Sequence, residues 1–484
     1  MRRASVSKRR RWALAVLFAS RAWLPQQAGA NGTFPAVSQL VSEPGNASHL
    51  ALRTTFGLVF STDAGASWRW ICEDALGYTN SLPAVAVLQG GPLVLGVPGG
   101  VTLGQLAGCD FAPAQGVSDN VVDLALVPQS RTGVLALGVD YVAHSSQLWE
   151  SRDAGKSFTP LGAPLPDFVA TTLDAAPSDP DVIYLSGMPL QTGATGLLLR
   201  SEDHGKTFVS HEVPDSVGQA WPYIGAIDPE LADKVYVRLA DVPGRLKVTL
   251  DGGSTFSEPL RIDYEMQGFA RSPDGKTVMV SSPAAGTFRA DSTSLRFERV
   301  ACAGVSCLMW NDAGLYACGD QSIDGYVVGR SFDRGASFTR TLDFSCIGSD
   351  SECGAATSFG SLCPALWPPI EMQLAGFGAC DANAPAPPIF DACLGSGGRP
   401  AGLGGANGAG GTSSAGGVDG RSGGSSGGAG TGGAQTRSDS GCAFAKRAAP
   451  GVAGAWFLLA SLLVWFVRKR ARALRVREDE FLHR

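Results

Sequence analysis

An eight-residue pattern that occurs five times along this 484-residue chain constrains its fold more than any other feature. The copies share a Ser or Thr, an Asp two positions later, a Gly two further, and an aromatic residue at the end. They are STDAGASW from Ser61, SRDAGKSF from Ser151, SEDHGKTF from Ser201, TLDGGSTF from Thr249 and SFDRGASF from Ser331. Such recurrence predicts a repeat protein whose units pack against their neighbours.

Each position of the pattern suits a tight turn between two strands. The Asp carboxylate and the hydroxyls bond backbone N–H groups, the Gly permits a positive φ, and the aromatic side chain starts the next strand facing inward. We therefore expect a structural, non-catalytic role for these residues. They are Asp63, Asp153, Asp203, Asp251 and Asp333, then Gly65, Gly155, Gly205, Gly253 and Gly335, and finally Trp68, Phe158, Phe208, Phe256 and Phe338.

The pattern resembles the Asp box, or BNR repeat, of sialidases and other β-propellers. That resemblance implies an all-β propeller in which each box lies on the hairpin between the third and fourth strands of a blade, far from any active centre. In sortilin-like receptors, which the chain also resembles, a Cys-rich module comes after a BNR propeller, and this chain likewise has a Cys-rich segment after its last box.

The spacing of the boxes counts the blades. Asp153, Asp203 and Asp251 are about 50 and 48 residues apart, enough for four short strands each. The intervals before Asp153 and after Asp251 are about 90 and 82 residues, so each contains one more blade with a degenerate box. We assign these to LAGCDF, with Gly108 and Phe111, and to RADSTSLRF, with Asp291 and Phe297. The total is seven, although six or eight blades also fit.

A second periodic signal supports an all-β fold. SDPDVIYL, DPELADKVYV and SPDGKTVMV each place a turn of Pro, Asp or Gly before a β-branched run, as expected between the first and second strands of a blade. Outside the two chain ends, no long helical period occurs. We therefore predict a seven-bladed β-propeller over residues 31–344.

The chain ends predict export and anchoring. Residues 1–30 combine a cationic start, a short apolar run and a small-residue site, as in a secretory signal peptide. Residues 394–441 form a Gly/Ser-rich linker that we expect to be disordered. Residues 451–467 are an uncharged apolar run followed by an arginine cluster, which predicts a transmembrane helix with a basic cytoplasmic end.

This tail, residues 442–484, resembles the myxobacterial sorting signal called MYXO-CTERM. The resemblance makes Cys442 the candidate for processing or lipidation; a plain membrane anchor is the alternative. The rest of the chain is then outside the cell, at the envelope or cell surface.

The chain has 11 cysteines, of which eight lie between Cys302 and Cys393. In an exported protein, this number favours disulfides. Cys72 and Cys109 occupy comparable places in adjacent blades, which favours their pairing. We interpret residues 345–393 as a disulfide-stapled extension whose Trp367 and Phe377 pack on the last blade. The spacing of these cysteines does not match a zinc site, and no metal or other cofactor is expected.

The sequence gives weaker indications of function. A net charge of −5 and a charged fraction of 17% show no basic surplus of the kind that nucleic-acid binding needs, so nucleic acid is not an expected partner. The Arg-Ile-Pro signature of sialidases is missing, so sialidase activity is not expected. Acidic residues that a glycosidase could use include Asp140, Asp174, Asp228 and Glu265, and the aromatic candidates for a binding face are Trp221, Tyr223 and Trp310.

The leading hypothesis is therefore a monomeric, surface-anchored propeller that binds a glycan or a protein without catalysis, across the face formed by the inner-strand loops. The alternative is a tethered glycoside hydrolase. No catalytic residue is assigned.

Overall fold

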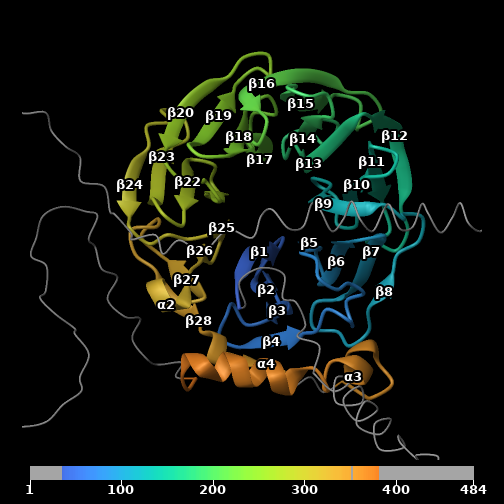
Figure 1. Cartoon of the computed structure of the whole chain (residues 1–484), viewed down its shortest axis with the longest axis vertical. Coiled ribbons are helices and arrows are strands. Elements are labelled where there is room, and N and C mark those ends of the chain that lie inside the picture. The colour runs from blue at the N-terminus through green and yellow to red at the C-terminus, as the bar shows by residue number, and fades with distance from the viewer. Residues whose placement is uncertain (1–34, 350–352, 381–484) are drawn as a thin grey trace, which may run out of the picture. The chain divides into compact units, whose positions relative to one another are not determined.

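A computed structural model describes residues 35–349 and 353–380, in which seven antiparallel sheets surround a central axis (Figure 1). Each sheet is one blade of a β-propeller, so the predicted count of seven is confirmed. Within a blade, the first strand lies nearest the axis and the fourth lies at the rim.

The strands follow one another in sequence, four to a blade. Blade 1 is β1 (Val37–Glu43), β2 (Asn46–Thr54), β3 (Gly57–Ser61) and β4 (Trp68–Ile71). Blade 2 is β5 (Ala84–Val87), β6 (Pro92–Val97), β7 (Gly100–Gln105) and β8 (Ala112–Pro113). Blade 3 is β9 (Asn120–Leu126), β10 (Val134–Asp140), β11 (Ser145–Ser151) and β12 (Thr159–Pro166). Blade 4 is β13 (Phe168–Ala175), β14 (Ile183–Pro189), β15 (Thr195–Ser201) and β16 (Val209–Val217).

The remaining blades repeat this order. Blade 5 is β17 (Trp221–Ile227), β18 (Val235–Ala240), β19 (Gly244–Thr249) and β20 (Ser257–Ile262). Blade 6 is β21 (Gly268–Arg271), β22 (Thr277–Ser282), β23 (Gly286–Asp291) and β24 (Glu298–Ala301). Blade 7 is β25 (Cys307–Asn311), β26 (Gly314–Cys318), β27 (Val328–Ser331) and β28 (Thr339–Leu342), with the short helix α2 (Gln321–Asp324) between its second and third strands.

The hydrophobic pattern of each strand matches its depth in the blade. The second strand β10, VLALGVD, is buried along nearly its whole length, because other blades cover both of its faces. Leu135 and Leu137 of β10 pack with Ile183 and Leu185 of blade 4 in one apolar cluster. The rim strand β12 is mostly exposed. The core therefore consists of apolar layers between adjacent blades.

Blades 7 and 1 close the ring without exchanging a strand, because each is built from four consecutive strands. Tyr316 and Val328 of blade 7 join Leu50 and Leu52 of blade 1 in a shared apolar cluster. Ser306, just before β25, donates a hydrogen bond from Oγ to the carbonyl oxygen of Val37 at 3.3 Å. Side-chain packing therefore forms this junction.

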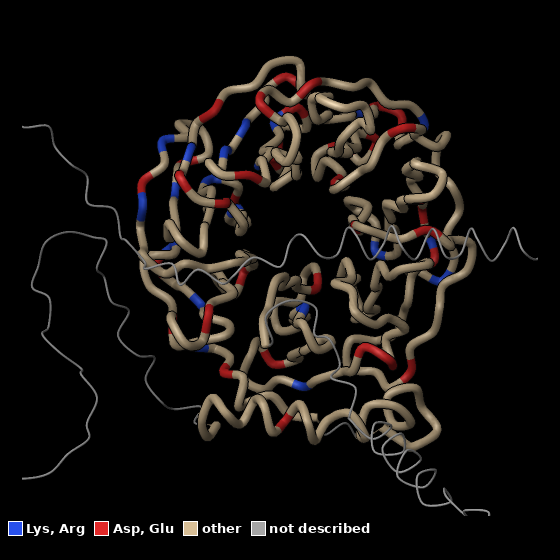
Figure 2. Tube along the Cα trace, in the orientation of Figure 1, with Lys and Arg blue, Asp and Glu red and all other residues tan. Residues whose placement is uncertain are grey.

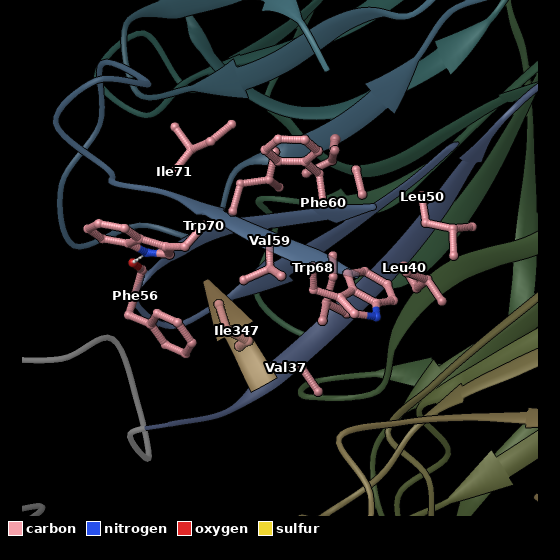
Figure 3. Close-up of a cluster of buried hydrophobic side chains, with 14 of the residues drawn as sticks. Val37, Leu40, Leu50, Phe56, Val59, Phe60, Trp68, Trp70, Ile71 and Ile347 are labelled. Carbon is pink, nitrogen blue, oxygen red and sulfur yellow. Dashed lines mark hydrogen bonds between the residues drawn. The ribbon is translucent and has the colours of Figure 1, made fainter. Parts of the chain in front are cut away.

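The residues after blade 7 run along the rim of blade 1, so Trp367 does not pack on the last blade as expected, whereas Phe377 packs on Phe344, which directly follows blade 7, with ring centroids 5.2 Å apart. They form η1 (Phe344–Cys346), β29 (Ile347–Gly348), α3 (Ser358–Leu362), α4 (Trp367–Leu374) and η2 (Ala375–Phe377). Strand β29 adds to β4 in parallel, which places Ile347 in the apolar cluster of blade 1 (Figure 3). The indole of Trp367 packs on Trp70 of β4, with ring centroids 5.2 Å apart.

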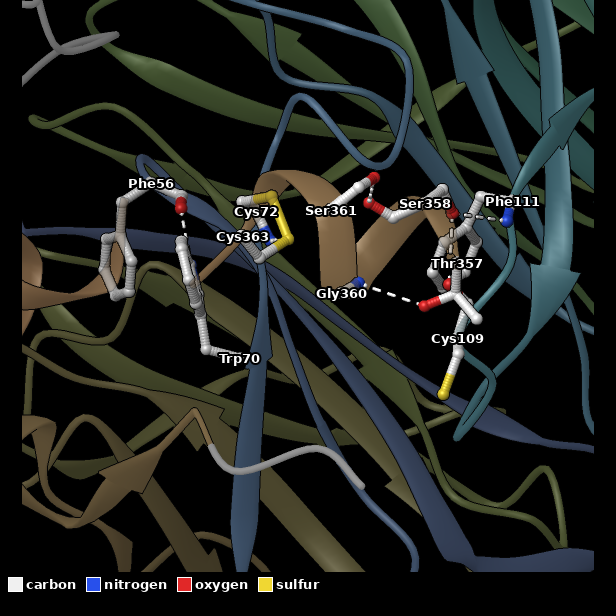
Figure 4. Close-up of a disulfide and its surroundings, with 10 residues drawn as sticks. All are labelled: Phe56, Trp70, Cys72, Cys109, Phe111, Thr357, Ser358, Gly360, Ser361 and Cys363. Atoms are coloured by element: carbon white, nitrogen blue, oxygen red, sulfur yellow. Dashed lines mark hydrogen bonds between the residues drawn. A yellow bond between two sulfur atoms is a disulfide. The ribbon is translucent and has the colours of Figure 1, made fainter. Parts of the chain in front are cut away.

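Disulfides tie this extension to the first two blades. Cys363 bonds Cys72, so the expected pairing of Cys72 with Cys109 is wrong (Figure 4). Cys109 instead bonds Cys353, and Cys346 bonds Cys380. Cys72 and Cys109 lie on neighbouring blades, and the extension passes both of them. Each therefore pairs with a cysteine of the extension. The remaining disulfide between described residues joins Cys307 and Cys318, which face each other on β25 and β26.

No helix in the described ranges has both the length and the hydropathy of a membrane span. The segments predicted at residues 1–30, 394–441 and 442–484, including the helix over 451–467 and Cys442, lie outside the described residues. Basic and acidic residues are interspersed around the ring and do not gather on one side (Figure 2).

Candidate functional site

The five box turns have one hydrogen-bond pattern and lie between the third and fourth strands of blades 1, 3, 4, 5 and 7. In blade 3, Oδ1 of Asp153 accepts from the hydroxyl of Ser151 at 2.8 Å and from the backbone N–H of Ser157 at 2.9 Å. Its Oδ2 accepts from the hydroxyl of Ser157 at 2.6 Å. The same three bonds occur at Asp63, Asp203, Asp251 and Asp333.

These bonds occupy both oxygens of each box carboxylate within its own turn. Hydrogen bonds from the residue four positions on, chiefly its hydroxyl, lower the pKa of Asp153, Asp203 and Asp251 to about 2. A carboxylate this acidic stays ionised at neutral pH and is a poor proton donor.

The box glycines have the expected positive φ, from 76° at Gly205 to 111° at Gly253. The preceding residue also has a positive φ, which the sequence analysis did not predict; Ala154, for example, has a φ of 63°. Non-Gly residues adopt this conformation at a cost, and here the hydrogen bonds of the box hold it.

Each box glycine lies against the preceding blade. A Cβ on Gly205 of blade 4 would lie 2.7 Å from Cδ2 of Leu148 in blade 3, and one on Gly155 of blade 3 would lie 3.0 Å from Cγ2 of Val94 in blade 2. In the same way, a Cβ on Gly253 would approach His211 of blade 4, one on Gly335 would approach Met279 of blade 6, and one on Gly65 would approach Thr341 of blade 7. The glycines therefore serve the close approach of neighbouring blades as well as the turn.

The box aromatics divide into two groups. Trp68, Phe158 and Phe338 are buried, whereas Phe208 and Phe256 are half-buried. In blade 2, the degenerate box LAGCDF forms the equivalent turn, but its Gly108 does not have the positive φ of the others. In blade 6, Oδ1 of Asp291 accepts from the backbone N–H groups of Thr293 and Ser294, each at 3.0 Å.

Two acidic side chains on adjacent inner strands are the most perturbed carboxyls near the axis. Burial raises the pKa of Asp123 on β9 to about 7, with a smaller contribution from the charge of Asp174. Burial likewise raises the pKa of Asp174 on β13 to about 6. Asp174 is one of the acidic residues expected from the sequence, whereas Asp123 is not; the position of Asp123 inside the apolar run VVDLALVP was the available signal.

Both of these carboxyls are bonded to backbone. Oδ2 of Asp123 accepts from the N–H of Leu173 in the next blade at 2.8 Å, and its Oδ1 accepts from Leu124 at 2.9 Å. Oδ1 of Asp174 accepts from Ala175 at 2.9 Å, and the carboxyl also receives a hydrogen bond from the backbone of Ile227 in blade 5. Each carboxyl therefore links two inner strands.

Two arginines near these strands are also buried, Arg53 on β2 and Arg271 on β21. Arg53 donates from Nε to Oγ of Ser38 and from Nη1 to the carbonyl oxygen of Pro83, both at 2.9 Å. Arg271 on β21 lacks a hydrogen-bond partner for its buried Nε and Nη1 among the described residues. Burial lowers the pKa of both guanidinium groups, which nevertheless remain charged at neutral pH.

The other acidic candidates have hydrogen-bond or ion-pair partners of their own. Asp140 closes the turn after β10 by accepting from Val142 and Ala143. Asp228 follows Ile227, whose backbone bonds Asp174; it forms an ion pair with Lys234 at 3.1 Å, and its charge, like that of Asp174, acts on Arg271. Glu265 accepts from the side chain of Gln267 at 3.3 Å. Within the described ranges, no three His, Cys, Asp or Glu side chains are grouped as a metal site would require.

The aromatic candidates also have separate environments. The guanidinium of Arg238 lies 4.7 Å from the ring centroid of Tyr223 on β17, the strand that Trp221 begins. Trp310 at the end of β25 lines a cavity of about 390 Å³ between blades 6 and 7. A second cavity, of about 330 Å³, lies between blades 1 and 2 and the extension, beside Cys109 and Cys353.

Comparisons with known proteins concern the fold. No family model matches the sequence, and no curated protein matches it either. Among solved structures, an ancestral GH74 enzyme is 14% identical with a TM-score of 0.49, over 65% of this chain and 47% of that chain. The extracellular domain of a one-component system from B. thetaiotaomicron is 11% identical with a TM-score of 0.43, over 60% and 38%.

A third structure, the β-propeller domain of Cps50 (Swd1) from Myceliophteria thermophila, is 12% identical with a TM-score of 0.42, over 59% of this chain and 94% of that chain. With TM-scores below 0.5, these likenesses carry no argument about the chain's ligand or activity, and its propeller fold rests on its own seven sheets. The disulfides indicate an extracellular protein, since they persist in oxidising compartments.

Proposed function

We propose that this chain is a non-catalytic binding module displayed outside the cell, with a glycan or a protein as its ligand. The observation that supports this most is the bonding of the two inner carboxyls. Asp123 and Asp174 accept backbone N–H groups of the next blade, so their oxygens help to hold the inner strands together. A glycosidase instead needs two carboxyls directed at substrate.

The box turns serve this module as scaffold. Both oxygens of Asp153 are bonded inside the turn, and Gly155 brings the turn against blade 2. These contacts support the assignment of the pattern to the Asp-box, or BNR, repeats and of its Asp, Gly and aromatic residues to a structural role.

Display at the surface follows from the two ends of the chain. We assign residues 1–30 to a signal peptide, residues 394–441 to a linker and residues 442–484 to a MYXO-CTERM-like tail, with Cys442 as the processing or lipidation candidate. Disulfides between the propeller and the extension are consistent with this location.

A tethered glycoside hydrolase is the second candidate, and one observation favours it. With a pKa of about 7, Asp123 is partly protonated at neutral pH, as a general acid must be, and Asp174 lies on the adjacent inner strand. Asp174 would then be the partner carboxylate.

One experiment separates the two functions. Full-length protein, purified under oxidising conditions, would be screened against a polysaccharide panel for binding and for release of reducing ends. Saturable binding without turnover is the expected result. Turnover that disappears in Asp123→Asn or Asp174→Asn, with the fold retained by circular dichroism, would establish the hydrolase instead.

A further inference from the structure

The cavity between blades 6 and 7 is formed by three turns on one face of the propeller. It is about 390 Å³ and lies at the end of the molecule that carries the box turns. Asp274 comes from the turn between β21 and β22, Trp310 and Asn311 from the turn between β25 and β26, and Phe332 and Arg334 from the box of blade 7. This volume is within the usual range of small-ligand sites.

Two aromatic rings in the wall, those of Trp310 and Phe332, pack against other side chains of the propeller. Trp310 is half-buried and packs on the apolar cluster of blades 6 and 7. Phe332 is 73% exposed, although the guanidinium of Arg330 lies 4.5 Å from its ring centroid. Arg330 is itself fixed, because it donates two hydrogen bonds to the carbonyl oxygen of Ala313. A ligand could therefore stack on Phe332 at little cost in side-chain entropy.

The polar groups of the wall offer both acceptors and donors. Oδ1 of Asp274 accepts from the hydroxyl of Ser272, whereas its Oδ2 accepts from no described residue. The hydroxyl of Ser272 and the N–H of Lys276 lower the pKa of Asp274, which keeps it an ionised acceptor. Nδ2 of Asn311 is buried and lacks a partner within residues 35–349 and 353–380.

The positively charged side chain of Arg334 lies in the same wall as the carboxylate of Asp274. Arg334 lines the same cavity, and its positive charge acts on Asp274, but the two side chains form no ion pair. Its φ of 59° fixes the backbone at the rim of the cavity. Donor and acceptor groups are therefore presented side by side without satisfying each other.

We propose that this cavity binds a saccharide. One face of a sugar ring is made of C–H groups that pack on an aromatic ring, and its hydroxyls both donate and accept hydrogen bonds. Phe332 and Trp310 supply the rings, Asp274 the acceptor and Arg334 the donor. The carboxylates of Asp274 and Asp312 oppose a phosphate-bearing ligand.

This inference rests on the proposed function, since it names the ligand class and the place where the binding module holds it. It also separates the ligand site from the axis, because Asp123 and Asp174 contribute nothing to the cavity. Phe332 stands at a position of the box that is not part of the shared pattern; the same position holds Thr62, Arg152, Glu202 and Leu250 in the other boxes.

The test uses full-length protein and a glycan array, followed by titration with the strongest saccharide. We expect Phe332→Ala and Arg334→Ala each to weaken binding about tenfold or more. Leu250→Ala is the matched control, because Leu250 is 67% exposed at the same box position of blade 5 and lines no part of the cavity. It should bind as the unaltered protein does.

Three results would overturn the inference. Saccharide binding that Phe332→Ala and Arg334→Ala leave unchanged places the site elsewhere but preserves the proposed function. Binding of a peptide at this cavity, lost in the same variants, with no saccharide bound, replaces the ligand class. Hydrolysis of the bound saccharide that disappears in Asp123→Asn overturns the proposed function itself. Because Phe332 is exposed, its loss should leave the melting temperature unchanged.

Discussion

The turn between the third and fourth strands is held in different ways in blades 3 and 2. In blade 3, Asp153 bonds the hydroxyls and N–H groups of its own turn. In blade 2, the N–H of Phe359 donates to the carbonyl oxygen of Cys109 at 3.0 Å, and the N–H of Ser358 donates to Oδ1 of Asp110 at 3.1 Å. Figure 4 shows the residues of α3 against this turn.

The difference separates local from long-range stabilisation. A box turn uses residues at most four positions apart, so it can form as soon as its own hairpin does. The turn of blade 2 depends on a disulfide to Cys353, 244 residues later, and is complete only when the whole ring has been made. The extension therefore substitutes for a lost box and also fixes the first blades to the end of the ring.

The largest effect should come from removing that disulfide. We expect Cys109→Ser combined with Cys353→Ser to lower the free energy of unfolding by about 2 to 5 kcal/mol, because the bond closes a long loop in the unfolded chain. Urea unfolding under oxidising conditions measures this. Cys307→Ser with Cys318→Ser is the control, since that bond spans 11 residues and should contribute less. An equal or larger loss in the control would contradict the long-range role of the extension.

A smaller loss is expected when a box glycine receives a side chain. Gly155→Ala should cost about 1 to 3 kcal/mol, because φ is +84° and the new Cβ would lie 3.0 Å from Val94 in blade 2. Ala154→Gly is the matched control and should stay within about 0.5 kcal/mol of the unaltered protein, since blade 5 has Gly252 at that place with φ of 71°. If the two variants had similar urea midpoints, the box turn would not require glycine at position 155.

Sequence patterns could predict the turns that are stabilised by residues close in the sequence, but not the turn of blade 2, which is stabilised by the distant extension. The box turns, the seven blades and the turns before β14, β18 and β22 depend on neighbouring residues, whose spacing is visible in the sequence. The partner of Cys109 is set by where the extension crosses the ring, and spacing alone leaves many pairings open.

The candidate site shows the same division. Trp310 was recognisable as an aromatic residue beside a turn, but its cavity also needs Phe332 and Asp274 from distant parts of the sequence. In the sequence, Asp123 is one polar residue within an apolar strand, and its raised pKa follows from its burial beside the adjacent blade, which the sequence does not show. The Nε2 atom of His204, in the box of blade 4, lies 3.0 Å from Oε1 of the buried Glu150 in blade 3, and nothing in the spacing of the boxes indicates that contact.

The next largest loss of unfolding free energy is expected when the carboxylate of a box is removed. Asp153→Ala removes three hydrogen bonds of an exposed turn and should cost about 1 kcal/mol. Asp153→Asn keeps an acceptor at Oδ1 and should lose less. In blade 2, Asp110→Ala removes one bond, to the N–H of Ser358, while the disulfide remains, so the expected loss is smaller still. Thermal unfolding of the three variants gives the order, and a larger loss in blade 2 would reverse the assignment of local and long-range stabilisation.

The smallest effect is the dependence of the box on pH. Hydrogen bonds, chiefly from the hydroxyl of Ser157, lower the pKa of Asp153 to about 2, against about 3.9 in an unfolded chain. The folded state thus binds fewer protons than the unfolded state between these values. The carboxylate stabilises the fold fully above about pH 4, and this contribution is lost as the pH falls towards 2.

The disulfide that holds the turn of blade 2 does not titrate. The difference in urea midpoint between the unaltered protein and Asp153→Ala should therefore narrow from pH 5 to pH 2.5. For Cys109→Ser with Cys353→Ser, the corresponding difference should stay nearly constant over the same range. If the Asp153→Ala difference did not narrow, hydrogen bonds to an ionised carboxylate would not be what closes the box.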